Sequence, residues 1–288
     1  MSPFRRSTVA VSVAVLIGTT SCAAQEQGAE TGSAVPGEGS GAVPDSHVHA
    51  LGIDPGDDQV LAATHDGLFE LGPDGPTRVG PVIDLMGFAV VGPGHYVASG
   101  HPGPGTDMPN PVGLIESTDG GSTWSALSRQ GESDFHSLAA WTKGVLAVGD
   151  GVERSEDRQS WTRLGGPADV YDLASPDGIS VLATTPAGPQ RSADSGTTWQ
   201  PLEEAPLLAL VEFVTPLRAV GVTPDGAVAS SDDAGATWEL QGRVDGGQPQ
   251  ALAAADDGNG TRVLVLTQDG VQSSEDGGRS FGQWQPVP

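Results

Sequence analysis

The stretch Ser117–Trp124 reads S-T-D-G-G-S-T-W, and variants of its pattern S-x-D-x-G-x-T-W recur along the chain. Close copies occupy residues 192–199 and 231–238, a copy that ends in Phe occupies 274–281, and a copy one residue shorter occupies 155–161. Successive copies begin 38, 37, 39 and 43 residues apart. A repeat of about 40 residues indicates one supersecondary unit repeated around an axis or along a line.

Each repeat unit holds four short segments separated by glycine-containing turns. In the third unit, for example, the runs 137–139, 145–148 and 152–155 lead into the motif, and a short segment follows it. Short segments broken by Asp-Gly or Gly turns are typical of β-strands, and no stretch after residue 46 shows convincing helical periodicity. Six such units follow one another, at about residues 47–82, 83–130, 133–166, 168–205, 207–245 and 248–286.

Four-stranded units of this length are typical of β-propeller blades, which close into a ring and leave only short sheet edges. We therefore predict an all-β, six-bladed β-propeller over residues 47–288. The first unit has lost the motif, with Leu71 at the position of the serine, and the second carries a proline-rich insert at residues 100–111. A seven-bladed ring is the alternative if that insert hides strands. The insert is either a semi-rigid functional flap or a tolerated surface insertion.

The repeated motif resembles the Asp-box, or BNR repeat, of bacterial sialidases and related glycosidases, sortilin-type receptors and photosystem II assembly-factor-like propellers. The resemblance covers nearly all of residues 47–286 and implies the fold, but that superfamily mixes enzymes with binding proteins. In the family the box forms the turn between strands 3 and 4 of a blade. The resemblance therefore implies a structural role, with calcium binding or catalysis as the alternative, for Asp119, Asp157, Asp194, Asp233 and Asp276.

The first 22 residues have the features of a secretion signal. Arg5 and Arg6 precede an apolar run at residues 9–18 that is too short to span a membrane, and small residues lead to Cys22, the only cysteine. The segment resembles a bacterial lipoprotein signal with its lipobox, which implies lipidation of Cys22 and anchoring to the outer side of the cell membrane. Thr19 stands where such boxes usually carry Leu, and an ordinary signal peptide cut nearby is the alternative.

Composition restricts the possible partners. Residues 23–46 contain Gly, Ala, Ser, Pro and four acidic residues, which predicts a disordered tether. The formal net charge of the whole chain is −24, and no basic patch is available to displace the counterions of a nucleic acid. We therefore exclude nucleic-acid binding and expect a monomer, with the membrane reached through the lipid anchor.

The position of the Asp-box predicts which face of the propeller carries function. If the turns between strands 3 and 4 lie on one face, the loops between strands 2 and 3 and the starts of the first strands lie on the other. Five of the six histidines map to that second face, and His95 maps to the first. With the two internal methionines, they form a set of candidate metal ligands: His47, His49, His65, Met86, His101, Met108 and His136.

The chemistry of these side chains leaves three interpretations open. Imidazole with thioether suits copper, and imidazole with carboxylate suits zinc, so either ion is a candidate cofactor. The second interpretation is that polar residues simply gather at a solvent-filled channel opening and bind no ligand. The third is an acid/base site in which a histidine or an aspartate acts on a glycan.

Two functional hypotheses remain from the sequence. A sialidase would need an arginine triad and a Tyr–Glu nucleophile pair, but the arginines are scattered and no Arg-Ile-Pro-like motif exists. The catalytic candidates are Tyr171, Asp134 and Asp84, and a two-carboxylate mechanism on a neutral glycan is also open. We predict a membrane-anchored extracytoplasmic propeller that binds a metal ion, glycan or protein at the mouth opposite the Asp-boxes, with a sialidase-like exo-glycosidase as the alternative.

Overall fold

The computed structural model describes residues 46–286 except residues 257 and 259. The expected signal segment 1–22, with Cys22, and all of the expected tether except residue 46 lie outside the described residues. Within the described part of the chain, no helix has the length and apolar character needed to cross a membrane.

The described residues form six antiparallel sheets of four strands each, and every sheet takes its strands in chain order. In chain order, the strands of blades 1 to 3 are β1 Val48–Ile53, β2 Val60–Thr64, β3 Gly67–Gly72, β4 Gly75–Val79; β5 Ile83–Gly92, β6 His95–Pro102, β7 Leu114–Ser117, β8 Ser125–Ser128; β9 Ser137–Ala140, β10 Val145–Val148, β11 Val152–Ser155 and β12 Thr162–Arg163. Those of blades 4 to 6 are β13 Asp172–Ala174, β14 Val181–Thr184, β15 Gln190–Ser192, β16 Gln200–Pro201; β17 Leu210–Phe213, β18 Ala219–Val222, β19 Ala227–Ser231, β20 Glu239–Arg243; β21 Ala251–Asp256, β22 Thr261–Thr267, β23 Gly270–Ser274 and β24 Gly282–Gln283.

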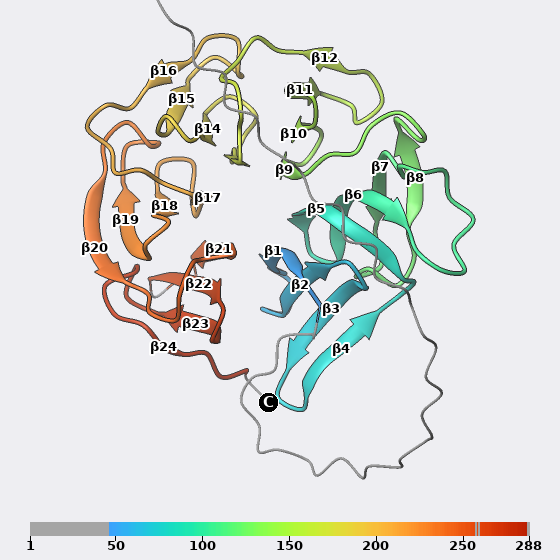
Figure 1. Ribbon diagram of the computed structural model, residues 1–288, viewed down its shortest axis with the longest axis horizontal. Helices are drawn as coiled ribbons and strands as arrows, with labels where there is room; N and C mark the ends of the chain where they lie inside the picture. Colours follow the sequence, from blue (N-terminus) through green and yellow to red (C-terminus); the bar gives the residue numbers. More distant parts are fainter. Residues whose placement is uncertain (1–45, 257, 259, 287–288) are drawn as a thin grey trace, which may run out of the picture. The chain divides into compact units, whose positions relative to one another are not determined.

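The blades are arranged in a closed ring around a central channel (Figure 1). The first strand of each blade contacts the first strand of the next, and β1 contacts both β5 and β21, which closes the ring. The prediction of a six-bladed, four-stranded β-propeller is confirmed. The seven-bladed alternative is wrong, because the insert of blade 2 adds no sheet to the six in the described residues.

The apolar core consists of six clusters, each lying between two neighbouring blades. In β22, for example, Val263 and Val265 belong to the cluster shared with blade 5, whereas Leu264 and Leu266 belong to the cluster shared with blade 1. Successive side chains of a strand point to opposite faces of its sheet, so both faces of this strand are buried. This is why the second strands read as unbroken apolar runs rather than as alternating sequences.

The Asp-box forms the turn between the third and fourth strands. In blade 5, Ser231 ends β19, accepts a hydrogen bond from the Gly235 amide at 2.9 Å and donates one to Asp233 at 2.8 Å. Asp233 also accepts bonds from the amide and the hydroxyl of Thr237, at 2.8 and 2.7 Å. Gly235 has a φ of 80°, and an added Cβ would lie 2.5 Å from Leu182 in blade 4. The turn therefore needs glycine for its conformation and for its close approach to the next blade.

Removal of the motif's serine hydroxyl tests the importance of this turn for stability. Ser231 is buried, and the change Ser231→Ala leaves the Gly235 amide without its hydrogen-bond acceptor. We expect the free energy of unfolding, measured by chemical denaturation, to fall by about 1–3 kcal/mol. The exposed Ser125 is the matched control, and Ser125→Ala should change stability by about 0.5 kcal/mol or less. Equal effects of the two changes would contradict a structural role for the box.

Candidate functional site

Histidines from the first two strands of blade 1 meet because β1 begins where β2 ends. Val48 pairs with Thr64 in the antiparallel register, and the His65 amide donates to the His47 carbonyl at 3.4 Å. A β-bulge between Val48 and Ala50 leaves His49 outside the regular pairing. Bulges redirect side chains, and here His49 lies beside both neighbouring imidazoles.

These three imidazoles and one carboxylate form a compact group, which we call the blade 1 cluster: His47, His49, His65 and Asp84. The His65 Nδ1 lies 2.8 Å from the Asp84 Oδ1 and 3.4 Å from the His49 Nε2. The ring of His47 lies 4.8 Å from that of His49 and 5.7 Å from that of His65, between centroids. Within the described residues, donor atoms of His49, His65 and Asp84 all lie within 4.8 Å of one another.

The blade 1 cluster keeps one imidazole unprotonated. Partial burial, together with repulsion from His65 and His47, lowers the pKa of His49 to about 4, although the nearby Asp84 carboxylate acts in the opposite direction. The imidazole of His49 is therefore neutral at pH 7, with its Nε2 facing the His65 Nδ1.

A second group of polar side chains lies where blade 2 meets blade 3. The Asp134 Oδ2 lies 2.9 Å from the His136 Nε2 and 3.2 Å from the His101 Nε2, and the His101 Nδ1 lies 2.7 Å from the Asn110 Oδ1. We call His101, Asp134 and His136 the blade 2–3 cluster. The two clusters are neighbours, because His136 contributes to the lowered pKa of His49 and both residues line one small cavity at the channel mouth.

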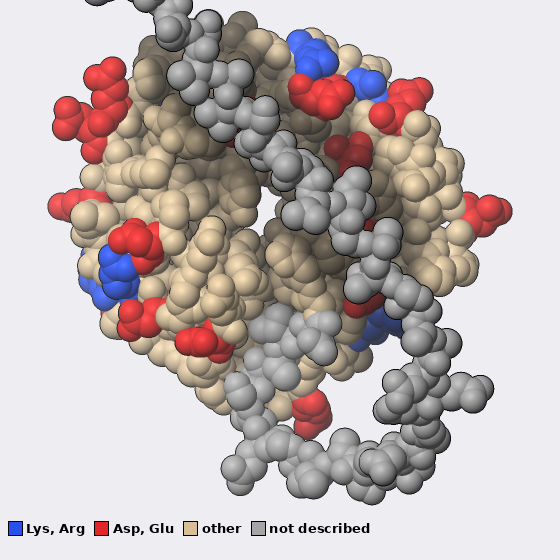
Figure 2. Space-filling model, viewed as in Figure 1, with Lys and Arg blue, Asp and Glu red and all other residues tan. Residues whose placement is uncertain are grey.

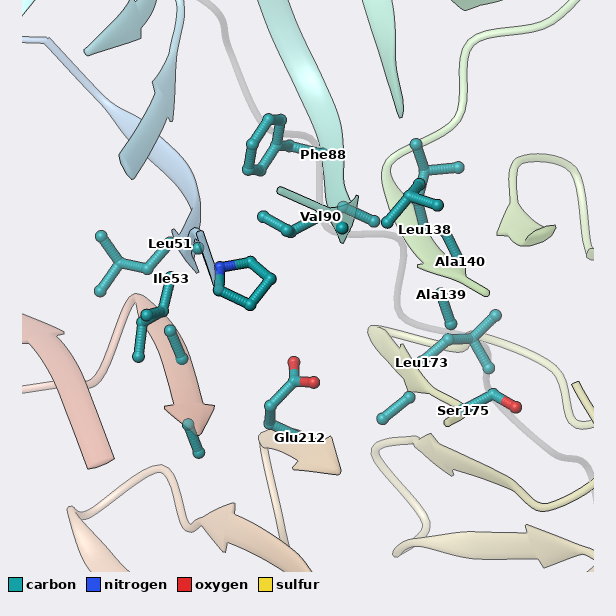
Figure 3. Close-up of a pocket in the computed structure, with 18 residues that line it drawn as sticks. Leu51, Ile53, Phe88, Val90, Leu138, Ala139, Ala140, Leu173, Ser175 and Glu212 are labelled. Carbon is teal, nitrogen blue, oxygen red and sulfur yellow. The ribbon is translucent and has the colours of Figure 1, made fainter. Parts of the chain in front are cut away.

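Below the mouth, the channel opens into a cavity of about 250 Å³. Figure 3 shows the carboxyl group of Glu212 in this cavity, surrounded by labelled side chains that are apolar apart from Ser175. Glu212 also lines the smaller cavity at the mouth, together with His49, His136 and Asp172. No lysine or arginine lines either of these two cavities.

Asp172 and Glu212 are acidic residues of the channel that the sequence analysis missed. Asp172 accepts hydrogen bonds from the Ser137 hydroxyl and the Val211 amide, at 3.1 and 3.0 Å, so its carboxylate links blades 3, 4 and 5. Burial raises the pKa of Asp172 to about 6, and burial together with the neighbouring Asp172 charge raises that of Glu212 to about 8. An acidic residue within the apolar run Leu210–Phe213 was the signal that could have revealed Glu212.

The remaining predicted site residues are dispersed. Met108 packs against the apolar cluster between blades 1 and 2, and Met86 occupies a second β-bulge, between Leu85 and Gly87. Tyr171 is 61% exposed at the start of blade 4. The other catalytic candidates, Asp84 and Asp134, are each in contact with histidines, as described above.

Acidic side chains predominate over basic ones on the surface. Figure 2 shows acidic side chains spread around the rim of the ring and few basic ones, with an opening at the centre. Several of the arginines pair with acidic residues, including Arg243 with Asp225 and Arg218 with Asp232, each at 2.8 Å. The field outside this protein therefore favours cations over anionic polymers.

No protein-family model and no curated protein matches the chain. Among solved structures, a GH74 enzyme of Niastella koreensis aligns with 83% of this chain and 37% of its own, at 18% identity and a TM-score of 0.57. The extracellular domain of the BT4673 hybrid two-component system from B. thetaiotaomicron aligns with 83% of this chain and 33% of its own, at 11% identity and a TM-score of 0.55. YCF48 bound to a D1 peptide aligns with 67% of this chain and 64% of its own, at 20% identity and a TM-score of 0.44.

These similarities concern the fold. The chain spans little more than a third of the GH74 enzyme and a third of the BT4673 domain. At identities below 20%, both similarities agree with the Asp-box resemblance at the level of a β-propeller. They do not transfer an activity to this chain.

The raised pKa of Glu212 predicts a pH dependence of stability. In the unfolded chain Glu212 loses its proton near its ordinary value of 4.5, whereas the folded protein retains it up to about pH 8. The folded state thus holds more protons, and the free energy of unfolding should fall as pH rises from 7 to 8, by at most about 1.4 kcal/mol per pH unit.

Glu212→Gln provides the comparison, because glutamine keeps the shape and cannot ionise. Subtracting its pH profile from that of the wild type removes the contributions of Asp172, His49 and His136, which face the same cavity. We expect the variant to lose less stability than the wild type between pH 7 and 8, by denaturant titration. Parallel profiles would contradict the loss of a Glu212 proton by the folded protein in this pH range.

Proposed function

We propose that this protein is a membrane-anchored, extracytoplasmic β-propeller that binds a divalent transition-metal ion at its channel mouth, through the blade 1 cluster. The observation that carries the proposal is the convergence of donor atoms from His49, His65 and Asp84 within 4.8 Å. Two imidazoles and a carboxylate from three different strands or loops form a set that zinc and copper(II) both accept.

The distances between donor atoms support a four-coordinate ion. With metal–ligand bonds of about 2.0–2.1 Å, neighbouring ligand atoms of a tetrahedral site lie about 3.3 Å apart. The observed separations are 3.4 Å between the His49 and His65 nitrogens and 2.8 Å between the His65 nitrogen and the Asp84 oxygen. The third separation, between the donor atoms of His49 and Asp84, is at most 4.8 Å, and binding of one ion requires these two atoms to approach each other.

Two further features of the blade 1 cluster favour metal binding. His47 lies within ring contact of both histidines, and the fourth position of the ion is left for an exchangeable water or an exogenous ligand. Because His49 is already neutral at pH 7, its proton need not be displaced. The methionine thioethers are not required, so the proposal favours zinc or copper(II) over a thioether-bound copper(I) site.

Metal binding at the blade 1 cluster can be measured by titrating the purified, metal-free protein with zinc or copper(II) in a calorimeter. We expect His65→Ala to weaken binding at this site by about 100-fold or more, because His65 contacts both other donors. His95→Gln is the matched control, since His95 begins β6 at the end opposite His101, and it should leave affinity unchanged. Zinc affinity that is the same in His65→Ala and wild type would refute the site.

The proposed location at a membrane depends on lipidation of Cys22 and on the tether predicted at residues 23–46. A flexible segment of about 24 residues would hold the propeller roughly 25–30 Å from a membrane surface, with its mouth free to exchange ions. We expect the protein to sediment with membranes of a bacterial expression host and Cys22→Ser to release it to the soluble extracytoplasmic fraction. Equal distribution of wild type and Cys22→Ser between the fractions would overturn the lipid anchor.

A further inference from the structure

The six blades place equivalent residues around the channel, and one of these residues differs from the rest. In each first strand, one residue pairs with the second residue of the buried run in the neighbouring second strand. Five blades carry glycine or alanine at this position, whereas blade 5 carries a glutamate. In blade order, the six residues are Gly52, Ala89, Ala139, Ala174, Glu212 and Ala253.

This exchange shapes the channel cavity of about 250 Å³, which all six residues line. Small residues at five positions leave the space open, and the sixth projects its carboxyl group into it (Figure 3). Of all the residues that line the cavity, only Ser175 and Glu212 have polar side chains. An apolar cavity of about 150 Å³ already holds a benzene molecule, so this one can hold a small organic ligand.

The carboxyl group of Glu212 has no cationic side chain beside it within the described residues. No lysine or arginine lines the channel cavity or the smaller cavity at the mouth. Burial and the neighbouring Asp172 charge raise the pKa of Glu212 to about 8, and the Phe213 amide only partly opposes them. A cation next to this group would favour its charged form.

The other groups near Glu212 leave it as the available anchor. Asp172 adds negative charge, but its two oxygens already accept hydrogen bonds from Ser137 and Val211. The remaining titratable groups that line the mouth cavity are His49 and His136. Glu212 lines both cavities and therefore lies where they meet. A ligand that enters from the mouth can keep its charged end at Glu212 and place its apolar part in the larger cavity.

We propose that the channel cavity binds a small organic amine in its protonated form, with the ammonium group paired to Glu212 and the apolar body packed against Leu51, Phe88 and Leu173. The first strands are the inner edges of their sheets, so backbone carbonyl groups that face the channel can accept the other ammonium hydrogens. The proposal does not depend on the metal site, because His65 and Asp84 line neither cavity.

Benzylamine is a probe of suitable size, with benzyl alcohol and benzoate as its neutral and anionic counterparts. Each compound is titrated in a calorimeter into the metal-free protein at pH 8, where the amine is still protonated. We expect benzylamine to bind at least about 10-fold more tightly than benzyl alcohol, because only the ammonium group forms a charge-assisted hydrogen bond with the carboxylate. Benzoate should not bind.

Two changes at Glu212 test the position of the amine. Glu212→Gln keeps the side-chain shape and removes the charge, and Glu212→Ala gives blade 5 the residue that four other blades carry. We expect each change to weaken benzylamine binding by about 10-fold or more. Glu239→Gln is the matched control, since Glu239 is exposed on the outer strand of the same blade. His65→Ala should also keep the affinity of the wild type, and circular dichroism checks the folding of every variant.

Three results would overturn the proposal. Equal affinities for benzylamine and benzyl alcohol would show that the cavity does not recognise a positive charge. Unchanged benzylamine binding in both Glu212→Gln and Glu212→Ala would place the amine elsewhere. A wild type that binds no benzylamine at millimolar concentration would leave the cavity without the proposed ligand. Because no metal is present in these titrations, each result leaves the proposed metal site as it stands.

Discussion

Burial of both faces of each second strand is the constraint on which this structure depends. A single blade would expose an apolar surface on either side, and only neighbouring blades on both sides can cover it. The ring satisfies this requirement for every blade once β21 meets β1. Each sheet consists of consecutive strands, so no strand is exchanged between the two ends of the propeller. Closure depends instead on the apolar cluster between blades 6 and 1, which includes Trp284.

The fold could be predicted because its signals are local. The serine and aspartate hydrogen bonds of an Asp-box join residues at most four positions apart. The motif is therefore visible in a short stretch of sequence. The face that carries the histidines also followed from strand order. The contacts between histidines and aspartates on that face could not be predicted from the sequence. They depend on the bulge at His49 and on the junction at Phe135, where residues distant in sequence meet.

The channel carboxyl groups show a further limit of sequence patterns. The first strands of blades 3, 4 and 5 have only three or four residues, too few for a clear alternation of buried and channel-facing positions. Asp172 acts across three blades through Ser137 and Val211, and such contacts leave no trace in the spacing of a repeat. They become apparent only when the ring brings the first strands together, and burial in that ring is the main cause of the raised pKa values.

The two faces of the propeller differ in how completely their aspartates are hydrogen-bonded. In the Asp-box turns, both oxygens of Asp276 accept hydrogen bonds, among them those from Ser274 and Ser280, and these bonds lower the pKa of the carboxyl group. Both oxygens of this aspartate are thus engaged within the turn. At the opposite mouth, Asp134 keeps one buried oxygen without a hydrogen-bond partner among the described residues, while its other oxygen contacts two imidazoles. The repeated motif therefore completes its own bonding within each turn, whereas the polar side chains at the opposite mouth bond across neighbouring blades.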